Sequence, residues 1–161
     1  MYLFRYKMNI VDMLSDKYIL VNFEASSKKN VLDELTKLVE REIKIDSQTL
    51  LDSLIKREKL GSTAVGGGIA IPHANCTNLD KPKVFVALLS NGLDFNANDD
   101  QLVDIVFLVL APTNKGSEHL QALALVSRLL RNKELTTKLR GCRVTESAFA
   151  VISQSVREKA A

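Results

Sequence analysis

The chain has 161 residues, of which 46% are hydrophobic and 25% carry a charge, a balance typical of a folded globular protein and not of a disordered or fibrous one. Its 22 basic and 19 acidic residues are mixed along the whole sequence, and the formal net charge is +3. The absence of a long basic block argues against nucleic acid or a membrane surface as a partner. The length predicts one domain over residues 1–161, large enough to build a core without a disulfide or a structural metal.

The sequence also indicates where the protein acts. No apolar run approaches the roughly 18 residues of a membrane-spanning helix, and the opening residues lack the apolar core of a signal peptide. Cys76 and Cys142 stand far apart without CxxC spacing, which is typical of free thiols in a reducing compartment. We therefore expect a cytoplasmic protein that does not insert into a membrane.

The first third of the chain alternates between helical and extended patterns. Residues 9–14 predict a short helical turn, and residues 18–23 are rich in β-formers and predict a strand. Apolar residues then recur at helical spacing over 27–41, with a serine at the start that can cap the first turn. A second amphipathic helix is predicted from about 47 to 59, and it ends near Gly61.

The next segment, residues 62–73, combines turn chemistry with a short strand. The triple glycine 66–68 favours a tight turn, and the residue before Pro72 is biased toward extended backbone. We therefore expect this turn to deliver a short strand to His73, which would lie at the exit of that strand.

Two continuous apolar runs follow, at 84–89 and 103–110. They lack the alternation of half-exposed strands, so we predict two central strands that are covered on both faces. Between them, Asn91-Gly92 and the segment 96–100 are predicted to form turns.

The last third of the chain is predicted to be helical. A helix over about 117–131 would have Ser117 as its N-cap and would turn Leu120 and Ala124, among others, toward the core. Two more helices are expected, over 133–139 and from 145 to about 157. Helices between strands in this order predict an α/β fold with a mixed, mostly parallel β-sheet flanked by helices on both faces.

The chain holds only two histidines, His73 and His119, and each falls in a loop or at the end of an element. A neutral imidazole can attack phosphorus and later release the group from an energy-rich phosphoramidate, because its pKa lies near neutrality. If Ser117 caps its helix, His119 lies in the first turn, where backbone N–H groups and the helix dipole favour an anion. The two histidines are therefore candidates for phosphoryl chemistry.

An arginine would be needed as well, because phosphoryl transfer develops charge on three oxygens that a planar guanidinium can bind in pairs. Arg57 is the candidate, since only a turn separates the end of its predicted helix from His73. An arginine at this position could equally neutralise the last carbonyls of its own helix.

Other chemistries find less support in the sequence. The triple glycine lacks the GxxxxGK[ST] of a P-loop and the GxGxxG frame of a dinucleotide site. A zinc site built from His73, Cys76 and His119 would have no recognised spacing, and no GxSxG nucleophile elbow is present. We therefore predict no metal site and no cofactor.

Two motifs carry a specific resemblance. Arg57-Glu-Lys-Leu-Gly-Ser-Thr63, followed by Gly68-Ile-Ala-Ile-Pro-His73, resembles the active-site signature of phosphotransferase system enzyme IIA domains of the fructose and mannitol class. Downstream, Leu93-Asp-Phe95, the run 103–110 and Glu118-His-Leu120 resemble the same family in order and spacing. Within that class the chain most resembles the nitrogen-related branch.

This resemblance implies a fold, a site and a donor. The fold would be that of a mannitol-type enzyme IIA, and His73 would be phosphorylated on a ring nitrogen by an HPr-type phosphocarrier. His119 would stabilise the phosphoryl group, and Arg57 would bind its oxygens. Two further residues of the motif are candidates for supporting roles, Ser62 and Thr63.

One departure from the family's pattern concerns the residues after the histidine. The family usually continues with Gly and often Lys, whereas this chain has Ala74 and Asn75. Alanine tolerates fewer backbone conformations than glycine, so the shape of this segment and the docking of a partner are expected to differ.

Three functions fit these observations. The first is a regulatory phosphocarrier whose charge change at His73 alters which targets it binds. The second is a sugar-uptake enzyme IIA that hands the phosphoryl group to an enzyme IIB for fructose or mannitol. The third is a non-catalytic interaction module, which the presence of Arg57, His73 and His119 disfavours.

Overall fold

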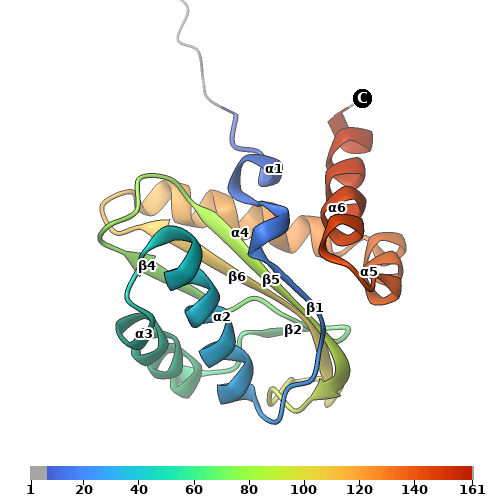
Figure 1. Ribbon diagram of the computed structural model, residues 1–161, viewed down its shortest axis with the longest axis horizontal. Helices are drawn as coiled ribbons and strands as arrows, with labels where there is room; N and C mark the ends of the chain where they lie inside the picture. Colours follow the sequence, from blue (N-terminus) through green and yellow to red (C-terminus); the bar gives the residue numbers. More distant parts are fainter. Residues whose placement is uncertain (1–6, 161) are drawn as a thin grey trace, which may run out of the picture.

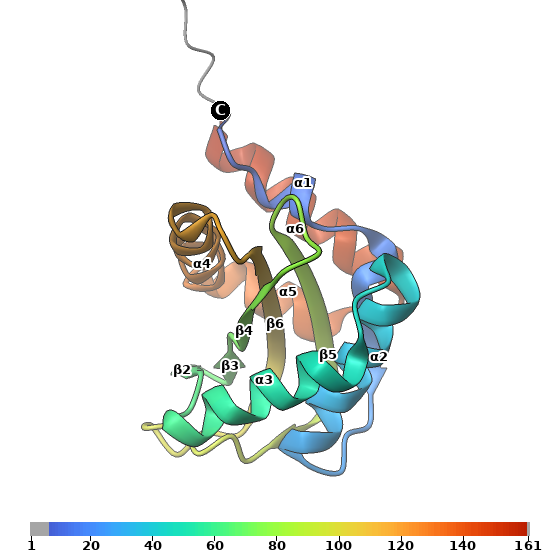
Figure 2. The same ribbon diagram turned by 90° about the vertical axis from the view of Figure 1, so that its left-hand side faces the viewer.

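The computed structural model describes residues 7–160, which form one β-sheet with helices on both faces (Figures 1 and 2). None of the helices within this range has the length and apolar character needed to cross a membrane. In chain order the elements are α1 Ile10–Met13, the 3-10 helix η1 Asp16–Tyr18, β1 Ile19–Phe23, α2 Lys28–Ile43, α3 Ser47–Leu60, β2 Ala64–Gly66, β3 Ile69–Ala70, β4 His73–Cys76, β5 Lys83–Leu93, β6 Val103–Pro112, α4 Gly116–Leu130, α5 Lys133–Gly141 and α6 Thr145–Ala160.

The two long apolar runs form the centre of the sheet, as the sequence predicts. β5 and β6 are antiparallel neighbours in the strand order β1-β5-β6-β3-β2, and β4 also pairs with β6. β1 runs parallel to β5, and both β3 and β4 run parallel to β6. Only β2 adds another antiparallel pair, with β3. The sheet is therefore mixed and mostly parallel, which confirms the predicted fold class.

The sheet separates two apolar cores, because successive side chains of a strand point to opposite faces. On β5, Val84 and Val86 pack in the core that α1, α4, α5 and α6 cover, whereas Phe85 and Ala87 pack in the core that α2 and α3 cover. Figure 2 shows these two groups of helices on opposite sides of the sheet. Covering both faces explains why β5 and β6 read as unbroken apolar runs.

The two helices that precede the site begin at residues that the sequence marks. The hydroxyl of Ser27 accepts the backbone N–H of Asn30 at 3.0 Å and caps α2. The carboxylate of Asp46 accepts the N–H of Thr49 at 2.9 Å and caps α3. These side chains satisfy donors that the first helical turn leaves free, so they fix where each helix starts.

The predicted turn at Asn91-Gly92 is wrong, because β5 continues through both residues to Leu93. Here the glycine serves close packing: a Cβ on Gly92 would lie 2.7 Å from the Cβ of Leu102. The chain reverses further on, where Asn96 and Asp100 adopt positive φ values of 56° and 59°. The turn predicted over residues 96–100 is therefore confirmed.

α4 is rotated relative to the prediction. Ser117 is not the N-cap, because the helix begins at Gly116 after Lys115, which makes no side-chain cap hydrogen bond. Leu120 is 72% exposed and Ala124 is also exposed, so neither faces the core. The side chains that do are Ala122, Val126, Leu129 and Leu130. Contacts with the sheet set this rotation. Helical periodicity alone did not decide which of two apolar faces of the helix is buried.

We predict that leucine truncations at the two ends of α4 lower the free energy of unfolding by very different amounts. Leu129→Ala removes a side chain that is 3% exposed and should lower the free energy of unfolding by about 2–5 kcal/mol. Leu120→Ala, the matched change at a site that is 72% exposed, should alter it by less than about 0.5 kcal/mol. Urea unfolding followed by circular dichroism measures both, and equal losses would contradict the observed rotation of α4.

Candidate active site

His73 begins β4, which continues the pairing of β3 along β6 after an interruption of two residues. β3 pairs with β6 through Ile69 and Ile105, and β4 pairs with it through His73 and Val109, in the same register. Pro72 lies in the interruption, where it has no N–H to contribute to a ladder. His73 is therefore the first residue of a new strand and does not lie at a strand exit, which corrects the expectation.

The ring of His73 folds back onto the backbone just before it. Its Nδ1 lies 3.0 Å from the carbonyl oxygen of Ile71. A carbonyl oxygen only accepts, so this contact requires the proton of the neutral ring to be on Nδ1. Nε2 then keeps its lone pair, and His73 is half-buried.

His119 meets His73 from α4. The two rings lie edge to face, with centroids 5.5 Å apart and planes inclined at 62°. His119 lies three residues before Ala122, on the same helix stripe that packs against the sheet, so its side chain is directed inward. Its Nε2 is buried and has no hydrogen-bond partner within the described chain.

The environment of His119 favours its neutral form. Burial, first, and the nearby His73, second, lower the pKa of His119 below its usual value of 6.5. Desolvation penalises an imidazolium because the low-dielectric surroundings do not replace its hydration. At neutral pH the site therefore presents His119 as a neutral imidazole.

Arg57 lies near the end of α3, the helix that packs beside β4. Thr49 and Ser53 of α3 line a surface groove of about 350 Å³ together with Asn75 of β4. Arg57 lies about one helical turn, or about 5.4 Å, beyond Ser53 along α3. His73 lies two residues before Asn75, or about 6.6 Å away along β4. The groove shows that α3 packs beside β4, the strand that begins at His73.

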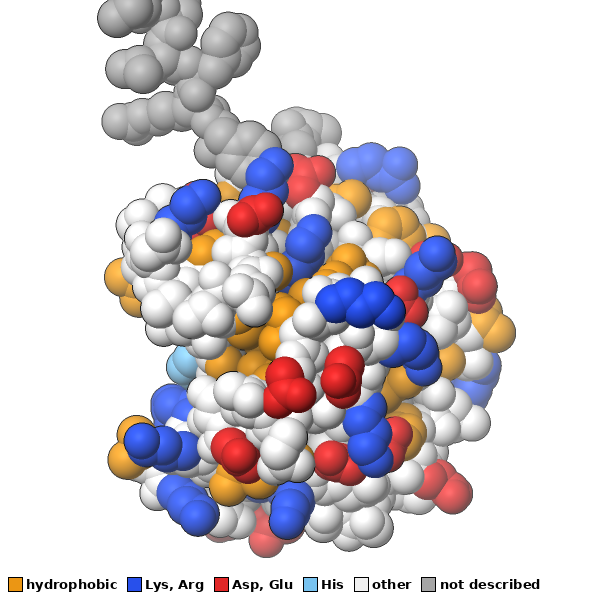
Figure 3. All heavy atoms as spheres, turned by 60° about the vertical axis from the view of Figure 1, so that its left-hand side comes forward, with side chains coloured by type: hydrophobic (Ala, Val, Ile, Leu, Met, Phe, Trp, Pro, Cys, Tyr) orange, Lys and Arg blue, Asp and Glu red, His pale blue; other side chains and the backbone are white. Residues whose placement is uncertain are grey.

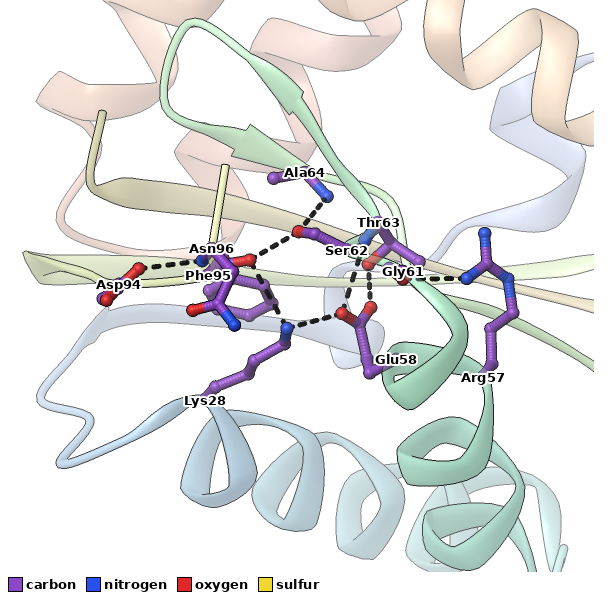
Figure 4. A network of polar contacts seen from close by, with 10 residues as sticks. All are labelled: Lys28, Arg57, Glu58, Gly61, Ser62, Thr63, Ala64, Asp94, Phe95 and Asn96. Carbon is purple, nitrogen blue, oxygen red and sulfur yellow. Dashed lines mark hydrogen bonds and ion pairs between the residues drawn. The ribbon is translucent and has the colours of Figure 1, made fainter. Parts of the chain in front are cut away.

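The guanidinium of Arg57 nevertheless makes no direct contact with either histidine among the interactions of the described residues. It donates from Nη1 to the carbonyl oxygen of Gly61 at 2.9 Å (Figure 4). This is the helix-end role that the sequence left open as the alternative. Figure 3 shows a histidine at the edge of the molecule with Lys and Arg side chains directly beneath it, so this part of the surface is basic.

Ser62 and Thr63 belong to a polar network under the turn that follows α3 (Figure 4). The Ser62 hydroxyl donates to the carbonyl oxygen of Phe95 and accepts the N–H of Ala64, the latter at 3.1 Å. The Thr63 hydroxyl donates to the Glu58 carboxylate. Both residues hold the turn in place, and neither has a hydrogen bond to a histidine side chain.

Two members of this network, Glu58 and Lys28, were missed by the sequence reasoning. Glu58 falls four residues after the buried Leu54, so the helical spacing alone puts this carboxylate on the inward face of α3. That signal was available. The partner was not, because Lys28 lies far away in sequence at the start of α2.

The departure at Ala74 and Asn75 has a structural explanation. Both lie in β4, so the segment after the histidine is a strand, where glycine's extra backbone freedom is not required. Ala74 is 7% exposed and packs in the core beneath α2 and α3. Asn75 is exposed and shares the face of His73 by strand alternation.

Comparison with known proteins assigns the chain to a group. A family model described as "Phosphoenolpyruvate-dependent sugar phosphotransferase system, EIIA 2" matches residues 12–155. A nitrogen regulatory protein of Bradyrhizobium diazoefficiens is 39% identical over 91% of this chain and 95% of its own length. The fructose-specific EIIABC component of Bacillus subtilis is 30% identical over 91% of this chain but 23% of its own length.

Solved structures agree with this grouping. The nitrogen regulatory protein IIA-Ntr of Neisseria meningitidis superposes with a TM-score of 0.82 at 29% identity, covering 89% of this chain and 98% of that one. The mannitol enzyme IIA of Escherichia coli, solved in complex with its phosphorylated enzyme IIB, gives 0.73 at 18% identity, covering 88% of this chain and 97% of that one. The second likeness concerns the fold alone.

We predict that His119 titrates below 6.5 when the pH dependence of its ring signals is followed by NMR. Its pKa is lowered because burial disfavours the charged ring, so His73→Ala should raise the value only in part, by removing the smaller contribution of His73. Protonation of His119 should then occur only as the pH falls well below neutrality. A pKa at or above 6.5 in the wild-type protein would show that the ring is solvated.

Proposed function

The chain belongs to the EIIA 2 family of the phosphoenolpyruvate-dependent sugar phosphotransferase system and is a phosphocarrier of that system, and on this premise we propose that His73 carries the phosphoryl group. One observation supports this choice above the others. The hydrogen bond from Nδ1 to the Ile71 carbonyl leaves the lone pair of Nε2 free, and His73 is only half-buried. The Nε2 of His119, by contrast, is buried.

Transfer to His73 is a direct exchange between two imidazoles. The lone pair of Nε2 forms a bond to the phosphorus of a donor phosphohistidine, and the bond from that phosphorus to the donor's nitrogen breaks. The bonding pair returns to the donor's ring, and His73 becomes an Nε2 phosphoramidate. Its Nδ1 keeps its proton, and the Ile71 carbonyl stabilises the positive charge that the ring gains.

The neighbours of His73 would stabilise the phosphoryl oxygens. The Nε2 of His119 is buried without a partner, and in its protonated tautomer this nitrogen can donate to an oxygen of the transferred group. Arg57 uses one N–H on Gly61, and its remaining donors can reach toward the anion after a rotation of the side chain. Neither group needs to change its net charge during transfer.

The donor would be an HPr-type phosphocarrier, and its docking surface would surround the site. Three large apolar side chains are exposed, two on elements that carry site residues and one in the strand that follows Thr63: Leu60 at the end of α3 by 82%, Leu120 in α4 by 72% and Val65 in β2 by 58%. Exposed apolar side chains with basic neighbours fit a transient protein interface better than a solvated surface. We infer that these three residues contact the partner.

We propose a regulatory role in the cytoplasm, as the names of the nitrogen regulatory relatives suggest. The match to the relative from Bradyrhizobium covers 91% of this chain and 95% of that protein. Phosphorylation would add about two negative charges beside basic side chains and so change which targets bind. A single phosphocarrier domain over 1–161 remains our prediction.

A role in sugar uptake is the second candidate, because the fructose-specific EIIABC component contains a segment 30% identical to this chain. In that case the phosphoryl group would pass from His73 to an enzyme IIB. A pure interaction module is disfavoured, since His73, His119 and Arg57 are all present.

We predict that incubation with phosphoenolpyruvate, enzyme I and HPr labels the wild-type protein with acid-labile phosphate. His73→Ala should abolish the label. His119→Ala and Arg57→Ala should each retain acceptance but slow it by roughly 10- to 1000-fold, because each removes one donor to the phosphoryl oxygens. Radiolabel followed over time measures these rates, and undiminished labelling of His73→Ala would refute the assignment.

We predict, for the regulatory role, that the labelled protein keeps its phosphoryl group when a fructose-type enzyme IIB is added, and loses it to unphosphorylated HPr by reversal. The sugar-uptake role predicts instead that transfer to the enzyme IIB is faster than transfer back to HPr. Leu120→Asp should weaken exchange with HPr by placing a charge in the proposed interface. Leu102→Asp, at an exposed apolar residue in the loop before β6, is the matched control.

A further inference from the structure

An unbroken chain of contacts joins the start of α2 to the imidazole of His73. We infer that Glu58 and Lys28 are positioning residues for His73: acting through Thr63 and Ile71, they hold the carbonyl that selects the proton-bearing nitrogen of its ring. This inference rests on the proposed function of His73 for its consequence in phosphoryl transfer. Its structural content, the control of the tautomer, is testable without any transfer.

The first contact is a shielded ion pair. The Nζ of Lys28 lies 2.6 Å from Oε2 of Glu58, and the two side chains are 21% and 7% exposed. The same ammonium group contacts the Phe95 carbonyl oxygen at 3.4 Å and lies 5.1 Å from the centre of the Phe95 ring (Figure 4). An ion pair so well shielded is screened little by salt, and loss of either partner leaves a costly unpaired charge.

The second contact joins the carboxylate to the turn after α3. Glu58 accepts the backbone N–H of Thr63 at 3.3 Å through Oε2 and the Thr63 hydroxyl through Oε1. Thr63 is 6% exposed, so both bonds are shielded from water. Two acceptors on one carboxylate fix both the position and the rotation of this residue, which a single bond would not do.

The third contact carries this constraint to the active-site strand. The carbonyl oxygen of Thr63 accepts the N–H of Ile71 at 3.0 Å. On the other side of the same segment, the carbonyl oxygen of Pro72 accepts the N–H of Val109 at 2.9 Å. The Ile71-Pro72 interruption is therefore held from both sides, and the Ile71 side chain is itself buried.

The last contact is the hydrogen bond from Nδ1 of His73 to the Ile71 carbonyl, at 3.0 Å. A small rotation of the Ile71 carbonyl would weaken this bond and allow the proton to move to Nε2. In that tautomer Nε2 has no lone pair to attack phosphorus, so this nitrogen would be inactive as a nucleophile. Lys28 and Glu58 thus influence the reactive nitrogen although neither touches it.

The test measures the tautomer directly, by long-range proton–nitrogen NMR of the full-length protein labelled with 15N-histidine. Only two histidines occur, and His119→Gln assigns the remaining signals to His73. Wild-type His73 should show a protonated Nδ1. Glu58→Gln and Thr63→Val should both increase the population with a protonated Nε2. Thr63→Ser, which keeps the hydroxyl, should give the same signal as the wild-type protein.

Two variants separate positioning from a general loss of stability. Asp104→Asn breaks the exposed pair in which Arg140 lies 2.9 Å from Asp104, and this pair does not belong to the chain of contacts. It should leave the His73 tautomer unchanged. The double variant Lys28→Met with Glu58→Gln removes both charges, so it should recover stability relative to Glu58→Gln alone but not the wild-type tautomer.

The expected effect on phosphoryl acceptance is a fall in initial rate of roughly 2- to 10-fold for Glu58→Gln, without a change in the HPr concentration that gives half the maximal rate. An unchanged His73 tautomer in Glu58→Gln and in Thr63→Val, which keeps the Glu58 charge, would overturn the inference. So would an equal tautomer shift in Asp104→Asn. If His73→Ala were still labelled, the proposed function would fail while the tautomer result would stand.

Discussion

Strand β6 is the constraint on which the site depends. It pairs with β5, β3 and β4, and nearly every one of its side chains is buried. His73 takes its place by pairing with Val109, and the chain leaving Pro112 leads directly into α4, which carries His119. Because the side-chain period of a strand is two, a slip of one residue between β4 and β6 would turn His73 into the core. The two histidines meet because both are positioned from the same buried strand.

Most of the fold could be predicted because its elements bury complete faces. β5 and β6 read as unbroken apolar runs, and α2 and α3 show both a periodic apolar stripe and a capping residue. The errors arise where a contact between two segments, and not the pattern within one segment, decides the outcome. β2 has only three residues and is defined by pairing with β3, and the continuation of β5 through Gly92 depends on the approach of Leu102. The periodicity of a single segment predicts neither contact.

The site could be predicted only as a set of residue types. The scarcity of histidine and the Gly-Ile-Ala-Ile-Pro-His motif indicate His73 and His119, and the structure brings their rings together. What sequence could not give is the state of each ring, because that follows from single atoms: the Ile71 carbonyl beside one imidazole and the lack of a partner for the other. Arg57 was named for anion binding, and in the structure its guanidinium caps Gly61.

These details suggest why the free site holds polar groups that are incompletely satisfied. A buried nitrogen without a partner, such as Nε2 of His119, costs free energy, and a fold keeps such an atom when a ligand satisfies it. On the proposed function, an anion bound to His73 would supply acceptors both to His119 and to the unused donors of Arg57. The phosphorylated form would then be the better satisfied of the two, and part of the energy of the phosphoramidate bond would be held in these contacts. A partner that receives the group must supply an anion-binding site of comparable strength, so the same unsatisfied donors that favour acceptance also limit which partners can take the group away.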